Sequence, residues 1–195
     1  MNRLGLLYPD ELNDEAKSLY QLLDKHVTAR DGDSMQFITK YDDGRYVGPL
    51  GVALRTPAVG HSFIATNQAI NRISGLSPKC KEIAILVVSA KDKPAYTLYA
   101  HTALAENCGI TPEEIESILQ MQRPRTFNEE EKVVYDFAYE LVRGEGPLSG
   151  TTWDRAIELI GEDGTTALTH LIGYYCYVCV LMRGFDCKVP CADDQ

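Results

Sequence analysis

The fold is decided by residues 77–109, which read SPKCKEIAILVVSAKDKPAYTLYAHTALAENCG. Ser77-Pro78 is a typical helix start, and the apolar run from Ile83 carries that helix through Ala90. Asp92-Lys93-Pro94 predicts a tight turn into a second helix, which ends at Asn107-Cys108-Gly109. Because the turn is short, the two helices should pack as an antiparallel pair.

This pairing predicts that a carboxylate and an imidazole lie at similar heights along the axes of the two helices. Glu82 lies 10.5 residues before the centre of the turn and His101 lies 8.5 residues after it. At ~1.5 Å of rise per residue, their levels differ by only about 3 Å. A carboxylate beside an imidazole fixes the tautomer of the ring, so His101 is a candidate general acid or base. Spacing alone leaves a purely structural role open for both residues, because a glutamate near a helix start is commonly stabilised by the helix dipole.

Hydroxyl groups accompany His101 on the second helix. Thr97 lies four residues before His101 and therefore shares its face, while Tyr96 and Tyr99 flank that face. We expect Thr97 to act in catalysis and the two tyrosines to bind substrate.

Helical signals continue along the rest of the chain, so we expect an all-α fold. Apolar residues recur at helical spacing from Pro9 to His26, whereas 29–50 contains the turn clusters Asp31-Gly32-Asp33 and Asp42-Asp43-Gly44. Pro49 and Pro57 each open a helix, the second running to about Ser74. Further helices are predicted near 112–121 and 129–144, each with a capping box, and near 152–160 and 164–182.

Composition and charge narrow the class of protein. The chain has 195 residues, 45% of them hydrophobic and 24% charged, which is typical of a folded globular protein. We expect one domain, with an N-terminal helix and loop over 1–45, a helical core over 46–182 and a tail over 183–195. The formal net charge of −9 argues against a nucleic-acid binder. The apolar runs are shorter than the ~20 residues of a membrane span, and the N-terminus lacks a secretory signal, so we expect a cytoplasmic protein without membrane contact.

Other chemistry-bearing residues are weaker candidates. His61 begins a polar patch that could line the same pocket, and Arg45 or Arg55 could hold a substrate carboxylate. A metal site from His61, Glu82 and His101 lacks any close-spaced ligand motif, so we expect neither metal nor cofactor. His26 and His170 are interpreted as structural. Cys176 and Cys179 form a Cys-x-x-Cys pair, but they lie far from a helix N-terminus, which favours core packing over redox activity.

The stretches 81–90 and 96–101, with Gly109-Ile110-Thr111-Pro112 after them, resemble the carboxymuconolactone decarboxylase and alkylhydroperoxidase D superfamily. The resemblance extends over about residues 46–190 and implies an alkylhydroperoxidase D-like helical bundle and a homo-oligomer. It matches Glu82 and His101 to the acidic and imidazole members of the peroxidase active site. The two redox cysteines of that branch would fall at Pro94 and Thr97, so the dithiol is absent from its usual position.

We therefore expect a cofactor-independent lyase or isomerase that acts on a small carboxylated cyclic metabolite. His101, oriented by Glu82, would transfer a proton during decarboxylation or isomerisation, and hydroxyl donors would stabilise the developing oxyanion. Two alternatives stay open. One is a thiol-dependent peroxide reductase that uses Cys176 and Cys179, and the other is a non-catalytic binding or assembly subunit.

Overall fold

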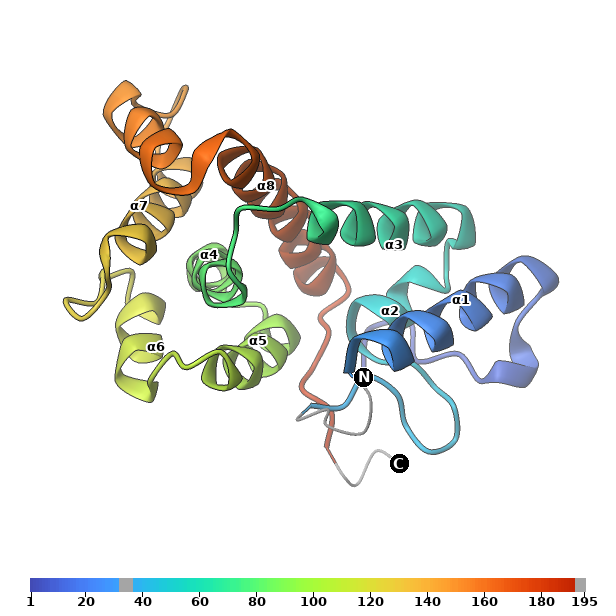
Figure 1. Ribbon diagram of the computed structural model, residues 1–195. Coiled ribbons are helices and arrows are strands. Elements are labelled where there is room, and N and C mark those ends of the chain that lie inside the picture. Colours follow the sequence, from blue (N-terminus) through green and yellow to red (C-terminus); the bar gives the residue numbers. More distant parts are fainter. Residues whose placement is uncertain (32–36, 192–195) are drawn as a thin grey trace.

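The computed structural model describes residues 1–31 and 37–191, with side chains at all of these positions except 29–31. Helices account for the regular structure of this described part, which confirms the all-α prediction (Figure 1). The elements are a 3₁₀ turn, Pro9–Glu11, and α1 Asp14–Asp31, α2 Gly48–Ala53, α3 Pro57–Arg72, α4 Pro78–Asp92, α5 Ala95–Asn107, α6 Pro112–Leu119, α7 Glu129–Arg143 and α8 Gly150–Gly184.

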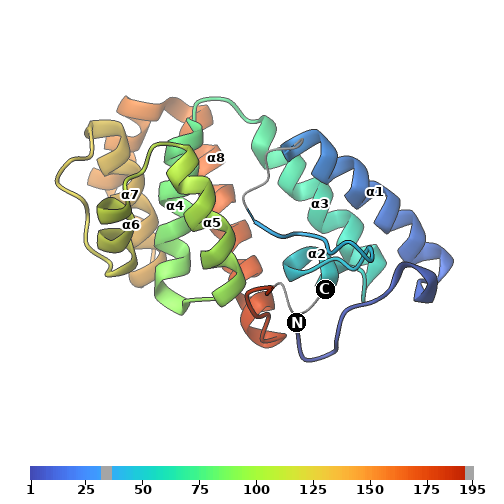
Figure 2. The same cartoon turned by 90° about the horizontal axis from the view of Figure 1, so that it is seen from below.

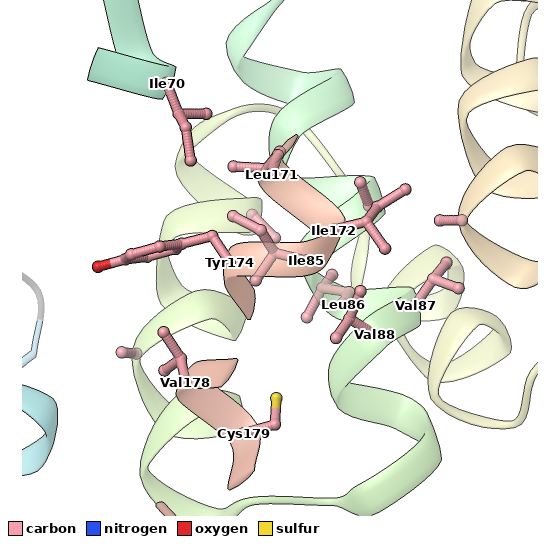
Figure 3. Packing of buried hydrophobic residues seen from close by; sticks show 14 of the residues in the cluster. Ile70, Ile85, Leu86, Val87, Val88, Leu171, Ile172, Tyr174, Val178 and Cys179 are labelled. Atoms are coloured by element: carbon pink, nitrogen blue, oxygen red, sulfur yellow. The ribbon is translucent and has the colours of Figure 1, made fainter. Parts of the chain in front are cut away.

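Helix α4 lies at the centre of the bundle, surrounded by α5, α6, α7 and α8 (Figures 1 and 2). Every residue from Ile83 to Ala90 is buried, so this helix is covered on all sides. Figure 3 shows Ile85, Leu86 and Val88 on the side of α4 that faces Leu171 and Ile172 of α8, whereas Val87 points away from α8. Ser77 caps the first turn by accepting a hydrogen bond from the backbone N–H of Cys80. The pair formed by α4 and α5 is therefore positioned by the burial of α4 in the hydrophobic core.

The predicted capping boxes form. The Thr111 hydroxyl accepts from the N–H of Glu114 while the Glu114 carboxylate accepts from the N–H of Thr111. Asn128 and Glu131 exchange the same two bonds at the start of α7. Each box satisfies two backbone donors that would otherwise lack partners.

The N-terminal prediction was wrong at both ends of the helix. Pro9–Glu11 forms a separate 3₁₀ turn, and α1 begins at Asp14 after Asn13 accepts a hydrogen bond from the N–H of Ala16. Helix α1 continues to Asp31, past the predicted loop start at residue 29, while Gly32 and Asp33 of the turn cluster lie outside the described residues. The two helices predicted after residue 150 form one long element, broken by non-helical backbone at Gly161.

By length and composition, α8 is apolar enough to cross a membrane, but half of its most apolar 18-residue window is buried inside the molecule. A helix in the core of a folded bundle shows the same property. The tail after α8 is tied to the N-terminus, where the N–H of Lys188 donates to the carbonyl of Met1. Residues 192–195 of the predicted tail lie outside the described part.

Candidate active site

Glu82 of α4 and His101 of α5 are in direct contact. His101 Nδ1 lies 2.8 Å from Glu82 Oε2, and the two side chains are only 13% and 12% exposed. Because a carboxylate accepts hydrogen bonds, the Nδ1–H donates to it, and Nε2 is then the nitrogen available for proton transfer. The ring of Tyr175 packs edge-on against the imidazole at 4.9 Å between centroids. Glu82 and Tyr175 together fix the plane in which the His101 ring lies.

His101 lines a cavity of about 70 Å³, which is room for several waters or one small molecule. Its walls come from α1, α2, α3, α5, α8 and the segment 37–39. The lining residues are His26, Phe37, Thr39, Pro49, Leu50, Phe63, Ile64, Asn67, Tyr96, Thr97, Ala100, His101, Leu104, Tyr174, Tyr175 and Val178. Aromatic and aliphatic side chains thus form most of the surface, with a few polar groups set among them.

Thr97 is the unusual polar group of this cavity. Its side chain is 2% exposed, and its hydroxyl oxygen has no hydrogen-bond partner. A buried hydroxyl without a partner costs about 1–3 kcal/mol, so folded proteins seldom keep one. Thr97 lies one turn before His101 on α5, as the sequence predicts, and both residues line the cavity. The hydroxyl oxygen itself is closed off from the cavity in this rotamer, so the Thr97 side chain has to turn for it to bond with an occupant.

Tyr96 and Tyr99 hold the backbone of Ile38 from both sides. The Tyr96 hydroxyl donates to the Ile38 carbonyl, and the Tyr99 hydroxyl accepts from the Ile38 N–H, both at 2.9 Å. Tyr96 also packs so closely on Gly48 that a Cβ there would lie 2.2 Å from its ring. Tyr96 lines the cavity and Tyr99 does not, so the prediction that Tyr99 binds substrate is not supported by its position. Figure 2 shows the segment after residue 36 starting beside α5 and running toward α2.

Three predicted binding residues lie away from the cavity. Arg45 pairs with Asp43 at 2.6 Å and packs over the rings of Tyr8 and Tyr41. Arg55 donates to the backbone carbonyls of Leu4 and Gly5, which anchors the N-terminal segment. His61 is half-buried on α3 and does not line the cavity. Each arginine is used by a neighbouring part of the fold, so its position does not support the prediction that it holds a substrate carboxylate.

Of the polar residues in the cavity wall, Asn67 belongs to the patch on α3 that the sequence suggested for this pocket, whereas His26 was missed. His26 of α1 and Asn67 of α3 both line the cavity, and the side chain of Gln68 approaches His26 Nδ1 at 3.3 Å. The interpretation of His26 as structural gave no indication of this place in the cavity wall. Among the described residues, no three His, Cys, Asp or Glu side chains gather as a metal site would require.

The Cys176 and Cys179 pair lies in the C-terminal third of α8, outside the cavity lining. Cys179 is 1% exposed and its sulfur lies 3.9 Å from the hydroxyl of Ser89. Burial raises the pKa of Cys179 to about 11, and burial also raises the pKa of Cys176. Burial therefore disfavours the thiolate, which is the reactive form, at both cysteines.

Comparison with known proteins places this geometry in context. Residues 57–140, which include Glu82, Thr97 and His101, match the carboxymuconolactone decarboxylase family. Comparison with curated proteins gives no significant match. A peroxidase-related protein from Ralstonia eutropha JMP134, described as an alkylhydroperoxidase AhpD core, is similar over 97% of this chain and 92% of its own, with a TM-score of 0.74 and 12% identity.

Two further solved structures share the fold. A peroxidase-related protein from Silicibacter sp. TM1040 has a TM-score of 0.70 at 16% identity, over 98% of this chain and 93% of its own. The debrominase Bmp8, in complex with 2,3,4-tribromopyrrole, has a TM-score of 0.64 at 12% identity, over 93% of this chain and 88% of its own. The family match covers residues 57–140, and the helical fold of these solved structures extends over nearly the whole chain, so both findings agree with the resemblance to carboxymuconolactone decarboxylase and AhpD-like proteins.

Proposed function

We propose that the protein is an enzyme that moves a proton on a small cyclic substrate, with His101 as the acid and base. The observation that supports this most directly is the 2.8 Å contact between His101 Nδ1 and Glu82, at the wall of a cavity. A carboxylate that holds Nδ1–H leaves Nε2 as a defined proton acceptor. Such a pair in a cavity is typical of general acid–base catalysis.

The proposed isomerisation has two proton transfers. His101 Nε2 takes a proton from the carbon next to a carbonyl group, and the electrons of the broken C–H bond move onto the carbonyl oxygen to form an enolate. The imidazolium then returns the proton to another carbon of the conjugated system. The substrate gains and loses no atoms or electrons overall, so the reaction needs no other reactant.

Decarboxylation would use the same groups in a different order. The C–C bond to the carboxylate breaks, its electrons form the enolate, and carbon dioxide leaves. A protonated His101 then delivers its proton to the carbon. Both reactions pass through an enolate, so both need a hydrogen-bond donor at the developing oxyanion.

Thr97 supplies that donor in our proposal. Its hydroxyl is buried, unpartnered and one helical turn from His101. Tyr96 already donates its proton to the Ile38 carbonyl, so it serves to hold the cavity wall. The thiol-dependent alternative has less support, because Cys176 and Cys179 lie outside the cavity and their pKa values are raised by burial.

Hydrogen–deuterium exchange tests the proposal before the natural substrate is identified. Small cyclic ketones and cyclic keto acids are incubated with the protein in D₂O, and NMR follows deuterium uptake and carbon dioxide release. We expect catalysis for at least one compound, with a loss of roughly 10²–10⁴-fold in His101→Gln. Glu82→Gln should lose activity as well, because a neutral amide no longer dictates which nitrogen carries the proton.

His61→Gln is the matched control. It changes a half-buried histidine that lies outside the cavity, so its activity should equal that of the unmodified protein. If every compound binds but none exchanges or loses carbon dioxide, the protein is a binding subunit and the enzymatic proposal is wrong. If all three variants retain activity, the reaction does not use His101.

A further inference from the structure

An aromatic wall runs along one side of the cavity. Phe63 of α3 stacks on Tyr174 of α8 with 5.0 Å between centroids and 24° between planes. Tyr174 meets Tyr175 edge-on at 5.5 Å, and Tyr175 meets the imidazole of His101 at 4.9 Å. All four rings line the same cavity. They form a continuous aromatic surface that ends at the group proposed to transfer the proton.

Aromatic surfaces favour flat ligands. Aromatic rings attract one another in offset-stacked and edge-to-face arrangements, worth about 0.5–1.5 kcal/mol beyond the area that they bury. A saturated ring buries similar area but offers neither a polarised edge nor a flat face. The wall formed by Phe63, Tyr174 and Tyr175 therefore discriminates between a flat ring and a puckered one of the same size.

The charges around the cavity disfavour an anionic ligand. The carboxylate of Glu82 lies directly behind His101 and is itself only 12% exposed. Tyr174 stays neutral because burial raises the pKa of its phenol. A ligand carboxylate would give up its hydration to enter an aromatic cavity that already has a buried acid beside it, which is costly while the two lining imidazoles, His26 and His101, are uncharged. Every lining residue within the described ranges is apolar, hydroxylic, an amide or an imidazole.

We propose that the cavity binds a flat, uncharged single-ring molecule with one oxygen acceptor, which receives a hydrogen bond from Thr97. The ring lies against Phe63, Tyr174 and Tyr175, and the oxygen meets the unpartnered hydroxyl. A cavity of about 70 Å³ limits the occupant to one small ring. This inference rests on the proposed function and narrows it to the isomerisation of a neutral enolisable ring, because decarboxylation needs the carboxylated metabolite that the sequence suggests.

Calorimetric titration of the whole protein at pH 7 tests the inference with three probes of similar size, namely phenol, cyclohexanol and benzoate. We expect phenol to bind at least tenfold more tightly than benzoate, and more tightly than cyclohexanol. Thr97→Val should weaken phenol binding by roughly threefold to tenfold, which is the contribution of one hydrogen bond to the affinity. Thr97→Ser, which retains the hydroxyl, should bind phenol within about twofold of the unmodified protein.

Each contrary result has a distinct meaning. Benzoate binding as tightly as phenol would overturn the neutral-ligand inference, and equal affinity for cyclohexanol would overturn the flat-ring inference. Phenol binding that ignores Thr97→Val would place the ligand elsewhere, as would a failure of all three probes to bind. Phenol bound in the expected pattern, without proton exchange on any cyclic ketone, would instead contradict the proposed function and leave the ligand class intact.

Discussion

Replacing Thr97 by valine should stabilise the free protein. Valine has nearly the same shape as threonine and a similar helix propensity, so the main change is the loss of a hydroxyl. That hydroxyl is buried and unpartnered, and its burial costs about 1–3 kcal/mol. If a trapped water recovers part of that cost, a net gain of about 1 kcal/mol remains. For a chain of this length, that gain corresponds to a Tm rise of about 2–4 °C.

Thr165→Val is the matched control for this prediction. Thr165 is also fully buried in a helix, but its hydroxyl donates to the carbonyl of Gly161 at 2.7 Å. Losing that bond should cost about 1 kcal/mol, so the two identical substitutions should change stability with opposite signs. Scanning calorimetry and urea unfolding measure both. If Thr97→Val lowers the Tm by as much as Thr165→Val, the Thr97 hydroxyl is satisfied within the folded protein and the argument for a ligand bond fails.

Three further outcomes are expected. The thiol of Cys179 has a pKa of about 11, so iodoacetamide should alkylate it roughly 100-fold more slowly at pH 8 than an ordinary thiol. The rate should increase as the pH rises toward 11. Rapid labelling of Cys179 in the folded protein at pH 8 would disprove this. Asn128→Ala removes the cap of α7 and should lower the free energy of unfolding by about 1 kcal/mol, whereas Asn128→Asp should preserve it. The expected homo-oligomer stays a prediction, and Val180→Glu, which charges a 61% exposed apolar position on α8, should lower the mass found by light scattering if that face is the interface.

The parts of the fold that depend on local signals were predictable. Ser77-Pro78 begins α4, Asn107 ends α5, and the Thr111 and Asn128 boxes begin α6 and α7, because caps and turns are encoded within a few residues. The contact between Glu82 and His101 follows from the same information, since a short turn fixes the register of an antiparallel pair. This part of the site can therefore be predicted from one stretch of about thirty residues.

The rest of the cavity depends on packing between distant segments, which periodicity does not encode. His26 and Asn67 reach the cavity only because α1 and α3 pack beside one another, and Ile38 is held there by two tyrosines of α5. Arg55 shows that the charge of a residue alone does not identify a ligand-binding position. It has the charge to bind a carboxylate, but its guanidinium is used by backbone carbonyls at the N-terminus.

Thr97 connects the acid–base proposal to the redox chemistry of the peroxidase branch that the sequence resembles. The resemblance matches Pro94 and Thr97 to the redox cysteines of the peroxidase branch, beside the same carboxylate and imidazole. Pro94 caps α5 without a side-chain bond, and Thr97 is the third residue of that helix. Exchanging sulfur for oxygen at this position removes electron transfer but keeps a hydrogen-bond donor one turn from His101. The buried hydroxyl has no partner in the protein, so in our proposal it gains a hydrogen bond only when the cavity is filled. Threonine in place of cysteine therefore changes the chemistry available in the cavity from electron transfer to hydrogen bonding, while the helices that position the site need not change.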